Sequence, residues 1–592
     1  MEELHKTKRV DLFSENAGGF EQQFVGSPGA VEQGHNASGR VPELYDLTQL
    51  EVSEFGVIPF AQQQNTRSKG GERLARLAVS RAEESKKSSQ KEGLSNSELV
   101  WPLELPGKRG VITLPDKRAE YMVLESKRPV QSALITDPEV LAAYCSDASS
   151  VVGSPEGLLR PNNADEAASW LAEAASAGIS VTPCGLRSST TGAGLAPSGW
   201  TMSCEKMLGA LELDLERGRA VVGAGTVLAD LKDELATHGF LYPPDPTSER
   251  ECSIGGTVAC DASGARTYRY GSTHRWVRGV EVALPDGTVR WFRSREVEKD
   301  AAGFAGLRDF VQVLCGSEGT LGFITRVEVQ LVPLPEAYTA GLAFFPDLAA
   351  ALEFVAGARA EDRAGTGVRP RCLELLDSGS LEIMEAQQSG VVIPAAAGAA
   401  IFFEEEHEGV AEMAALERWW ALLSGSSQAL IDDTVVATER AQQEELRSLR
   451  HAVPSTLNEE GGRLAAAGGK KISTDWAVPF EHLAPLMQKI DAWLSEAGIG
   501  RFVRYGHVGN GHPHYNLIVA DAREAAVAAS VVDRMCAEAC RLGGTITAEH
   551  GVGKLKIPYL HHRYGALELA AMRGVKAAFD PKGIMAPGNL FR

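Results

Sequence analysis

The sequence predicts an α+β fold with two domains that follow a long N-terminal extension. Between about residues 132 and 334, short apolar strands mix with amphipathic helices, and Pro285-Asp286-Gly287 joins two apolar runs as a hairpin turn does. A regular βαβ repeat is not evident there. After Leu331–Pro335, strands and helices alternate in a pattern that indicates an antiparallel sheet with helices packed on it. We therefore expect domains at 132–334 and 335–592.

Composition and charge limit the classes of function. The 592 residues carry a formal net charge of −19, which argues against non-specific nucleic-acid binding, because such binding needs a basic surface. The nine cysteines include no CxxC pair, so we expect reduced intracellular thiols and no iron–sulfur module. No secretory signal is visible, and no apolar run is long enough to span a bilayer. These observations predict a soluble cytoplasmic protein.

The extension at residues 1–131 carries no chemical signal, and we expect it to be partly disordered. An amphipathic helix is possible over Glu72–Ser85, and the polar run Lys86–Ser97 has the composition of a linker. Strand-like pieces occur within Leu103–Ala133. The sequence assigns it no role beyond packing, assembly or tethering.

The first domain begins with helices that carry clear start signals. Asp137-Pro138 opens a short helix, because aspartate favours the helix N-terminus and proline tolerates the first turn. Asn163 is the expected N-cap of an amphipathic helix with acidic residues in its first turn. In order, the expected elements are helices at 137–144 and 164–177, strands at 179–183 and 220–223, a helix at 227–238, and strands at 277–284 and 289–292.

The second domain is expected to alternate strands and longer helices. Its most apolar stretch, Val391–Phe403, contains Pro394 and predicts a buried strand or helix segment. The expected strands are 338–345, 399–405, 503–506 and 514–519, and the expected helices are 348–356, 410–422, 481–497 and 523–542.

Two glycine-rich segments near the C-terminus carry most of the chemical signal. They are Gly506–Asn516, with His507, His512 and His514, and Thr547–Gly553, with Glu549 and His550. Polar groups that are costly to bury, placed in glycine-rich backbone among apolar strands, indicate a site rather than a core. Imidazoles with one carboxylate form an N/O ligand set suited to a divalent metal such as zinc, manganese or iron. A further histidine beside that carboxylate is able to move protons near neutral pH.

The spacing alone leaves the ligand pair ambiguous. On a straight strand His512 and His514 share a face, whereas His507 and His514 do not. A bulge or turn at Gly509–Gly511 would bring His507 and His514 together, because glycine adopts positive φ readily. Both pairings stay open at this level, as does the interpretation that the histidines are structural.

Three glycine-rich loops in the first domain indicate an extended ligand that lies along exposed backbone. They are Thr182–Gly194, Tyr242–Ala265 and Cys315–Thr325. The first loop follows a strand, and its backbone N–H groups are able to close around a phosphate. It is not a P-loop, because no Gly-Lys-Ser/Thr ends it, and it lacks the dinucleotide fingerprint before a long helix. Each loop by itself is equally consistent with a surface turn.

Together these loops and segments resemble a known superfamily. The order and spacing of the loops, with Phe579–Gly588 downstream, resemble the FAD-binding domain of the vanillyl-alcohol oxidase superfamily. The C-terminal half is similar to the cap domain of FAD-linked 2-hydroxy-acid dehydrogenases, such as D-lactate dehydrogenase, the glycolate oxidase flavin subunit and D-2-hydroxyglutarate dehydrogenase. Ser-Ile-Gly-Gly, Gly-Ser-Glu-Gly-Thr-Leu-Gly and Ala-Glu-His-Gly are the most specific segments. The resemblance covers about residues 132–592.

The resemblance implies a two-part FAD-binding domain of the vanillyl-alcohol oxidase type plus an α+β cap domain with an antiparallel sheet. The final segment, about 575–592, is then expected to return to the FAD domain. The residues implied to contact FAD are Pro183, Gly185, Ser188, Ser189, Thr190, Pro244, Asp245, Ser253, Gly255, Gly256, Ala259, Ala262, Gly264, Glu318, Gly319, Gly322, Ile324 and Asn589. Because no histidine lies in the first loop, where some relatives attach flavin covalently, we expect non-covalent FAD.

The same resemblance implies roles for the C-terminal residues. The implied metal ligands are His507, His514 and Glu549, and the implied catalytic residues are His550 as base, Arg450 on the substrate carboxylate and Asn516 as a substrate contact. Arginine suits a carboxylate because its planar fork binds both oxygens. Either Lys470 or Lys471 is expected to add positive charge near the substrate.

The implied reaction is the metal-assisted oxidation of a 2-hydroxy acid to a 2-keto acid, with hydride transfer from C2 to flavin N5. The implied metal is zinc or manganese, with iron as a further option. Reoxidation then needs a separate acceptor, which is a flavoprotein, a quinone, a cytochrome or oxygen. A homodimer is compatible with the sequence.

Several residues depart from the family pattern. Asn510 replaces an aspartate and His512 replaces an asparagine, so His512 is either a competing ligand or a determinant of substrate choice. In the first loop, Cys184 stands where arginine is common, but that loop acts mostly through its backbone. Two alternative functions therefore stay open: a flavoenzyme similar to alkyl-dihydroxyacetone-phosphate synthase, which uses flavin without net redox, and a non-catalytic flavoprotein subunit.

Overall fold

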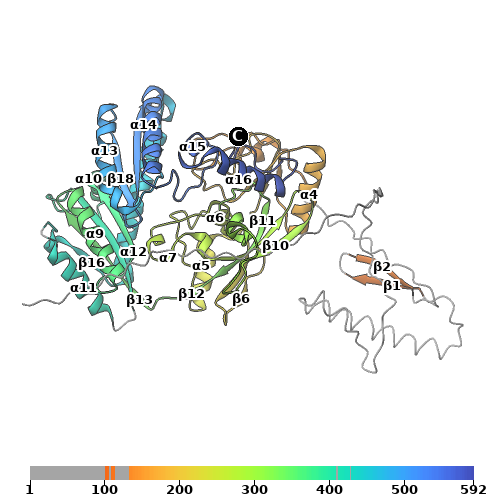
Figure 1. The fold of residues 1–592 in the computed structure, drawn as a ribbon, viewed down its shortest axis with the longest axis horizontal. Helices are drawn as coiled ribbons and strands as arrows, with labels where there is room; N and C mark the ends of the chain where they lie inside the picture. Colours follow the sequence, from red (N-terminus) through yellow and green to blue (C-terminus); the bar gives the residue numbers. More distant parts are fainter. Residues whose placement is uncertain (1–99, 106–107, 114–132, 408–410, 427, 592) are drawn as a thin grey trace, which may run out of the picture. The chain divides into compact units, whose positions relative to one another are not determined.

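The computed structural model describes residues 100–105, 108–113, 133–407, 411–426 and 428–591 (Figure 1). In the N-terminal extension, β1 (Val100–Leu105) pairs antiparallel with β2 (Lys108–Thr113), so part of the expected strand-like region is a hairpin. The helix expected at 72–85 and the linker expected at 86–97 lie outside the described residues.

The first domain contains a small parallel sheet with the strand order β3-β5-β4. Its strands are β3 (Gly157–Leu159), β4 (Val181–Cys184) and β5 (Trp200–Ser203), preceded by α3 (Pro138–Ala142) and joined by α4 (Ala164–Ala177). Asn163 caps α4 as expected, because its Oδ1 accepts from the Glu166 backbone N–H at 2.9 Å. The first glycine-rich loop leaves the end of β4 and therefore starts at a buried sheet.

A second, five-stranded antiparallel sheet completes the first domain, with the order β10-β9-β11-β7-β6. Its strands are β6 (Glu212–Asp214), β7 (Arg219–Gly223), β9 (Val277–Ala283), β10 (Val289–Arg293) and β11 (Phe323–Gln330). The remaining elements are α5 (Leu228–Thr237), β8 (Phe240–Leu241), α6 (Ile254–Cys260), α7 (Thr267–Tyr270), α8 (Phe310–Leu314) and β12 (Val332–Pro333). One apolar core joins both sheets with α4, α5 and α6, so the loops that leave them have a common support.

The second domain is built on a seven-stranded antiparallel sheet with the order β16-β13-β15-β14-β18-β19-β17. Its strands are β13 (Ala337–Phe345), β14 (Pro370–Asp377), β15 (Ala399–His407), β16 (Val435–Ala437), β17 (Gly468–Ser473), β18 (Phe502–His507) and β19 (His512–Asp521). The helices are α9 (Leu348–Ala364), α10 (Ser378–Glu385), α11 (Glu412–Gly425), α12 (Arg440–Leu464), α13 (Leu483–Glu496), α14 (Ala522–Arg541), α15 (Leu560–Arg563) and α16 (Ala566–Phe579).

Helices cover both faces of this sheet (Figure 1). One face packs against α9, α11, α13 and α14 in a core that contains Phe345, Phe403 and Tyr515. The other face packs against α10 and α12, with Phe344 and Phe402 in its core. Neighbouring strand residues thus enter different cores, as the two-residue period of a strand requires.

The C-terminal segment returns to the first domain. The Val181 N–H donates to the Ile584 carbonyl and the Ala586 N–H donates to the Val181 carbonyl, each at 2.8 Å, beside β4. Phe579 at the end of α16 packs against Phe292 and Phe310. The end of the chain therefore lies against the small parallel sheet.

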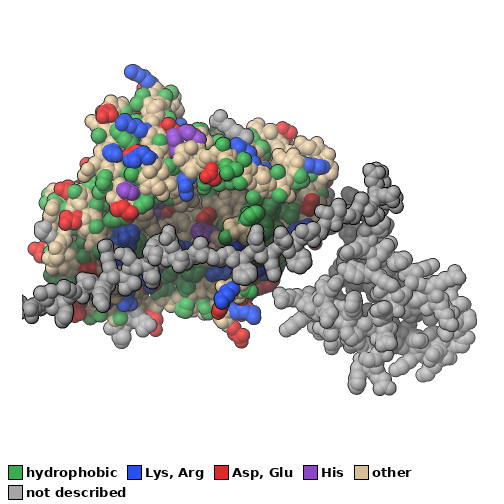
Figure 2. Space-filling model, in the orientation of Figure 1, with side chains coloured by type: hydrophobic (Ala, Val, Ile, Leu, Met, Phe, Trp, Pro, Cys, Tyr) green, Lys and Arg blue, Asp and Glu red, His purple; other side chains and the backbone are tan. Residues whose placement is uncertain are grey.

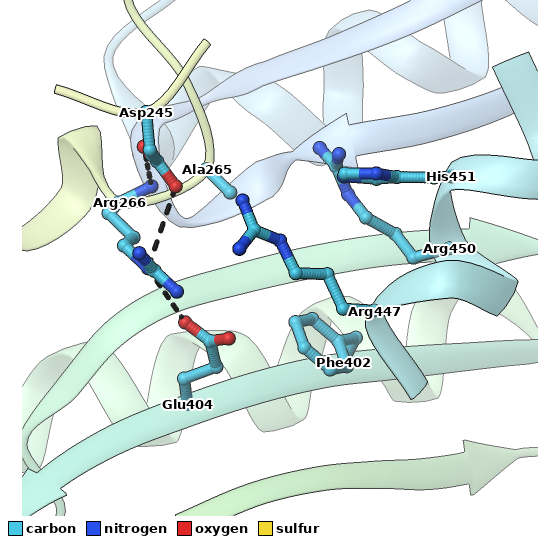
Figure 3. A pocket seen from close by; sticks show the side chains of 8 residues that line it. All are labelled: Asp245, Ala265, Arg266, Phe402, Glu404, Arg447, Arg450 and His451. Atoms are coloured by element: carbon cyan, nitrogen blue, oxygen red, sulfur yellow. Dashed lines mark hydrogen bonds and ion pairs between the residues drawn. The ribbon is translucent and has the colours of Figure 1, made fainter. Parts of the chain in front are cut away.

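Buried ion pairs join the two domains around a cavity of about 20 Å³ (Figure 3). Arg266 of the first domain donates through Nε to Glu404 Oε2 at 3.1 Å and lies 3.5 Å from Asp245 Oδ2. Arg371 donates to the same oxygen of Glu404 at 2.6 Å. Charged groups buried in this way are tolerated because each has a partner. Figure 2 shows acidic and basic side chains interspersed over the visible surface of the described residues.

The observed elements confirm the α+β fold and most expected strands and helices. The helix expected at 348–356 runs on to Ala364, and the one expected at 410–422 spans Glu412–Gly425. The apolar stretch 391–403 forms a strand only from Ala399 onward, after the turn at Pro394. Among the described residues no helix is both long and apolar enough to cross a membrane.

Candidate active site

A cleft of about 1400 Å³ lies between the loops of the first domain and the sheet of the second. This volume exceeds that of a typical small-ligand pocket, so it suits a dinucleotide together with a substrate. The residues expected to contact FAD that line the cleft are Pro183, Gly185, Ser188, Ser189, Thr190, Ser253, Gly255, Gly256, Ala259, Ala262, Glu318, Gly319, Gly322 and Ile324. The structure thus brings the three loops to one wall.

Close backbone packing requires glycine in this wall. A Cβ at Gly255 would lie 2.7 Å from Ala224 Cβ, which is closer than real side chains approach. Gly319 adopts a φ of +73° where its missing Cβ would meet Pro183 at 2.8 Å. Glycine at both positions therefore allows the loops to pack closely on their neighbours. A wall of glycine-rich backbone is what we expect for a ligand that lies along the main chain.

Four of the residues expected at FAD do not line this cleft. Pro244 and Gly264 lie beside it in the chain, and Asp245 is held by Arg266 at the domain boundary. Asn589 ties loops together, because its Nδ2 donates to the carbonyls of Ala193 and Glu318 at 2.8 and 3.0 Å. Asp245 and Asn589 thus bind residues that form or adjoin the cleft wall, and they do not line the cleft themselves.

Glu318 connects the loop wall to the segment that carries Glu549 and His550. Its two carboxylate oxygens accept the N–H groups of Val552 and Gly553 at 2.6 and 2.7 Å. Burial raises the pKa of Glu318 to about 7, against the effect of these two hydrogen bonds. This side chain fixes the two functional segments relative to each other.

The histidines come together through the hairpin of β18 and β19. His507 pairs directly with His512, and Tyr505 pairs with His514. Since directly paired residues share a face, and residues two apart on one strand also do, all three histidines point to one side. Gly511, with a φ of +70°, closes the short turn between the strands. The turn expected at Gly509–Gly511 thus decides the ambiguity, and it gathers three histidines rather than two.

Glu549 reaches the centre of this group. Its Oε1 lies 2.8 Å from His507 Nε2 and 3.8 Å from His512 Nδ1, and its Oε2 lies 3.6 Å from His514 Nε2. One ligand atom from each of the four side chains lies within 4.8 Å of the others. The group is buried, so its polar atoms have little access to water.

The outward-facing nitrogen of each imidazole has an acceptor beside it. His507 Nδ1 lies 2.6 Å from Glu374 Oε1, and His514 Nδ1 lies 3.2 Å from the Thr474 carbonyl. His512 Nε2 lies 3.2 Å from Asp475 Oδ1, although without hydrogen-bond geometry. Outer acceptors of this kind orient metal-binding imidazoles and fix their tautomers. The donor set therefore fits a divalent metal that prefers nitrogen and oxygen.

Burial and neighbouring charges shift the pKa values in this group. Burial lowers the pKa of His507, but the carboxylates of Glu374 and Glu549 outweigh it and raise that pKa to about 10. Burial and the neighbouring imidazole of His512 lower the pKa of His514. Burial raises the pKa of Glu549, but His507 outweighs it and lowers that pKa. The two carboxylates thus concentrate negative charge where a cation would lie.

His550 lies at the edge of the same group. Its ring stacks on that of His514, with centroids 5.7 Å apart, and its Nε2 lies 4.0 Å from Glu549 Oε2. Its backbone N–H donates to Asp475 Oδ2 at 3.1 Å, and its Nδ1 lies 3.6 Å from Asp475 Oδ1. Burial lowers the pKa of His550 more than Asp475 raises it. The imidazole is therefore neutral near pH 7 and able to accept a proton.

Arg450 lines the cleft from α12, but Glu374 already binds one edge of its guanidinium. Arg450 Nη2 and Nε lie 2.6 and 3.2 Å from Glu374 Oε2, and Nη1 lies 3.3 Å from Thr247 Oγ1. Glu374 thus joins Arg450 to His507. Asn516 lies on the same sheet face and contacts Ser473 and the His514 carbonyl, and Lys470 and Lys471 both line the cleft.

Sequence reasoning missed two acids and a lysine that support this group. Glu374 is an acid between two leucines in strand β14, and a charged residue within a short apolar run is the signal that would have found it. Asp475 is fully buried and accepts from Thr547 Oγ1 and Lys556 Nζ, each at 2.5 Å. It lies in Ser473–Trp476, where a carboxylate stands directly before a buried tryptophan.

Comparisons with known proteins agree with this architecture. A family model for FAD linked oxidases, C-terminal domain, matches residues 334–590, and one for an FAD binding domain matches residues 155–293. Glycolate oxidase subunit GlcD from Bacillus subtilis is 30% identical over 442 residues, which are 74% of this chain and 89% of that protein. The chain belongs to the FAD-linked oxidase family. It is an FAD-dependent oxidoreductase.

Other relatives of this family span nearly the same region. D-2-hydroxyglutarate dehydrogenase from Xanthomonas citri is 29% identical and covers 77% of this chain and 94% of its own length. D-lactate dehydrogenase from Anaerostipes hadrus is 27% identical and covers 80% of this chain and 98% of its own length. A solved structure of alkyldihydroxyacetonephosphate synthase superposes with a TM-score of 0.59 at 17% identity, covering 77% of this chain and 83% of that one. That likeness shows the shared fold, and together with the FAD binding domain matched at residues 155–293 it agrees with the expected vanillyl-alcohol oxidase type of fold.

Proposed function

We propose that this FAD-linked oxidase converts a 2-hydroxy acid to the 2-keto acid and uses a divalent metal ion. One observation carries the proposal: His507, His514 and Glu549 form one cluster with His550 beside it, and this cluster reaches the cleft of the glycine-rich loops through His514, Glu549 and His550. The relatives named for glycolate, D-2-hydroxyglutarate and D-lactate support the substrate class.

The bound groups would supply chemistry that side chains lack. FAD, if held non-covalently along the glycine-rich loops, would supply a hydride acceptor, and a metal held by His507, His514 and Glu549 would supply a Lewis acid for oxygen atoms of the substrate. The electrons then pass to a separate acceptor, which is a flavoprotein, a quinone, a cytochrome or oxygen. Zinc, manganese and iron all suit the nitrogen and oxygen donors of the cluster.

His550 is the proposed proton acceptor for the substrate hydroxyl. Its neutral imidazole lines the cleft, and its Nε2 points toward Glu549 at 4.0 Å. Asp475 holds the His550 backbone and lies beside Nδ1. An imidazolium formed at His550 would therefore have a buried carboxylate as its neighbour, which stabilises the charge.

Arg450 and Asn516 are the proposed substrate contacts. Because Glu374 binds the Nε–Nη2 edge of Arg450, the substrate carboxylate is expected to approach the Nη1 side, beside Thr247. Asn516 lies two residues from His514 on the same sheet face. Arg450 lines the cleft and offers a group suited to a carboxylate, whereas Asn516 is buried behind the cleft wall, so its contact needs the substrate to reach the sheet itself.

The test is anaerobic visible spectroscopy of the holoprotein with D-lactate, glycolate or D-2-hydroxyglutarate. Bleaching of the flavin band by one acid, lost on chelation and restored by a divalent ion, is the expected result. Bleaching that survives complete metal removal would contradict the metal part. A flavin that none of these acids bleaches would instead favour a flavoenzyme without net redox or a non-catalytic flavoprotein.

The His550→Ala variant tests the base. It should retain FAD but lose flavin reduction by about 10²–10⁴-fold, as general bases contribute. His561→Ala is the matched control, because His561 is exposed and hydrogen-bonds to the Pro558 carbonyl. The flavin of this variant should be reduced by the substrate at the wild-type rate. Full activity of His550→Ala would remove His550 from the mechanism.

A further inference from the structure

His512 stands out from the other histidines of the cluster, because the family pattern has no imidazole at its position. We propose that His512 is a fourth protein ligand of the metal, so that three histidines and Glu549 hold the ion. The presence of a metal in this proposal rests on the proposed function. The new element is the ligand set, which adds His512 to His507, His514 and Glu549.

The position of His512 in the hairpin carries the first part of the argument. It pairs directly with His507 and lies two residues from His514, so the sheet register directs all three rings to one side. The ring centroid of His512 lies 5.4 Å from that of His507 and 4.5 Å from that of His514. A ring this close to both expected ligands cannot be separate from their site.

The orientation of the ring carries the second part. Nδ1 of His512 faces Glu549 Oε1 at 3.8 Å, while Nε2 faces Asp475 Oδ1 at 3.2 Å. The inner nitrogen thus points to the carboxylate that His507 and His514 also face, and the outer nitrogen points to an acid. His507 has the same pattern, with Glu374 in the outer position and Glu549 in the inner one. A carboxylate behind an imidazole is the usual support of a metal-binding histidine.

Burial carries the third part. His512 is only 3% exposed, and its Nε2 has no hydrogen-bond partner among the described residues despite the nearby Asp475. A buried imidazole without satisfied nitrogens costs free energy, and a metal bond at Nδ1 would offset that cost. A metal would also let Nε2–H turn fully toward Asp475 as its donor.

The ligand count has a consequence for the substrate. On an ion that takes six ligands, as manganese and iron do, two histidines and one carboxylate would leave three positions, and a third histidine would leave two. Two positions match the two oxygens, one from the hydroxyl and one from the carboxylate, that a 2-hydroxy acid offers. Asp475, which lies beside both His512 and His550, would then position a metal ligand and the proton acceptor together.

The first test counts imidazoles directly in wild-type holoprotein loaded with Co²⁺ after removal of its native ion. Each histidine bound to Co²⁺ gives one paramagnetically shifted, exchangeable imidazole N–H resonance in proton NMR. We expect three such resonances in the wild type and two in His512→Asn. Two resonances in the wild type would overturn the proposal, whether or not the variant folds.

The second test measures Co²⁺ affinity by competition with a chelator. His512→Asn should bind about 100-fold more weakly or worse, since even the loss of an outer partner costs 10- to 100-fold. His407→Asn is the matched control, because His407 is buried but contacts Thr339 at 3.1 Å rather than the cluster. Equal affinity of wild type and His512→Asn would contradict the proposal.

These outcomes separate the ligand set from the proposed function. If the wild type shows two imidazoles but its flavin is still bleached by a 2-hydroxy acid, His512 is not a ligand and the proposed function stands. If the wild type binds no Co²⁺, the fourth ligand is excluded, and the substrate experiment then judges the function by itself.

Discussion

Replacement of Glu249 by glutamine should weaken the contact between the two domains. Glu249 Oε2 lies 2.9 Å from Lys232 Nζ on α5, and its Oε1 lies 2.9 Å from Arg447 Nη2 on α12. Burial raises the pKa of Glu249, but Lys232 and Arg447 outweigh it and lower the pKa from 4.5 to about 2. Glutamine keeps the size of the side chain and removes the charge, so the variant isolates this effect.

The pKa difference sets the magnitude of the loss. A fall from 4.5 to about 2 corresponds to about 3 kcal/mol of the free energy of unfolding at neutral pH. Since the folded-state pKa is depressed, this contribution is present above pH 4.5 and is lost as pH falls toward 2. Near pH 3 it should have fallen to about 1 kcal/mol. The wild type and Glu249→Gln should therefore differ most near neutral pH.

Reversible urea unfolding followed by tryptophan fluorescence, at pH values from 7 down to the lowest at which the fold persists, measures this difference. Glu444→Gln is the matched control. Glu444 forms an exposed ion pair with Arg440, four residues earlier on α12, and this pair should contribute no more than about 0.5 kcal/mol. An equal loss in the two variants, or a loss from Glu249→Gln that does not shrink as pH falls, would refute the reasoning.

Two further substitutions test the sheet that carries the histidines. Gly506→Ala should abolish metal binding, because a Cβ at this φ of +110° would lie 2.6 Å from His514 Cδ2, whereas Gly500→Ala meets no atom within 4 Å and should bind metal normally. Metal analysis of the two purified variants decides this, and full metal content in Gly506→Ala would contradict it. Phe403→Ala should lower the free energy of unfolding by about 3–5 kcal/mol, because Phe403 is buried and stacks on Trp419 at 3.8 Å. A loss below about 1 kcal/mol in urea unfolding would contradict this estimate, because it would show that the core closes around the missing ring at little cost.

The elements that the sequence predicted best are those whose ends are marked by capping or turn residues within the element itself. Asn163 and the acidic first turn defined the start of α4, and Pro285-Asp286-Gly287 defined the turn between β9 and β10. By contrast, α12 was missed as an element, because it is long, polar and interrupted by Pro454. Its stability comes from packing against the sheet, which no local pattern reports. The helix nevertheless supplies Arg450, so the missed element matters for the site.

The local sequence determined which residue types are candidates for the site and which glycine-rich loops are expected to lie along a ligand. His507, His514, Glu549 and His550 were identified from short segments and a family resemblance, and the fold gathers them into one group, of which His514, Glu549 and His550 line the cleft. Tertiary structure alone decided their partners, since Glu374 reaches His507 from a strand 133 residues away. It also decided that His512 joins the cluster, because strand register determines which side chains share a face. Composition and spacing specify local chemistry, whereas the pairing of distant strands sets the distances on which that chemistry depends.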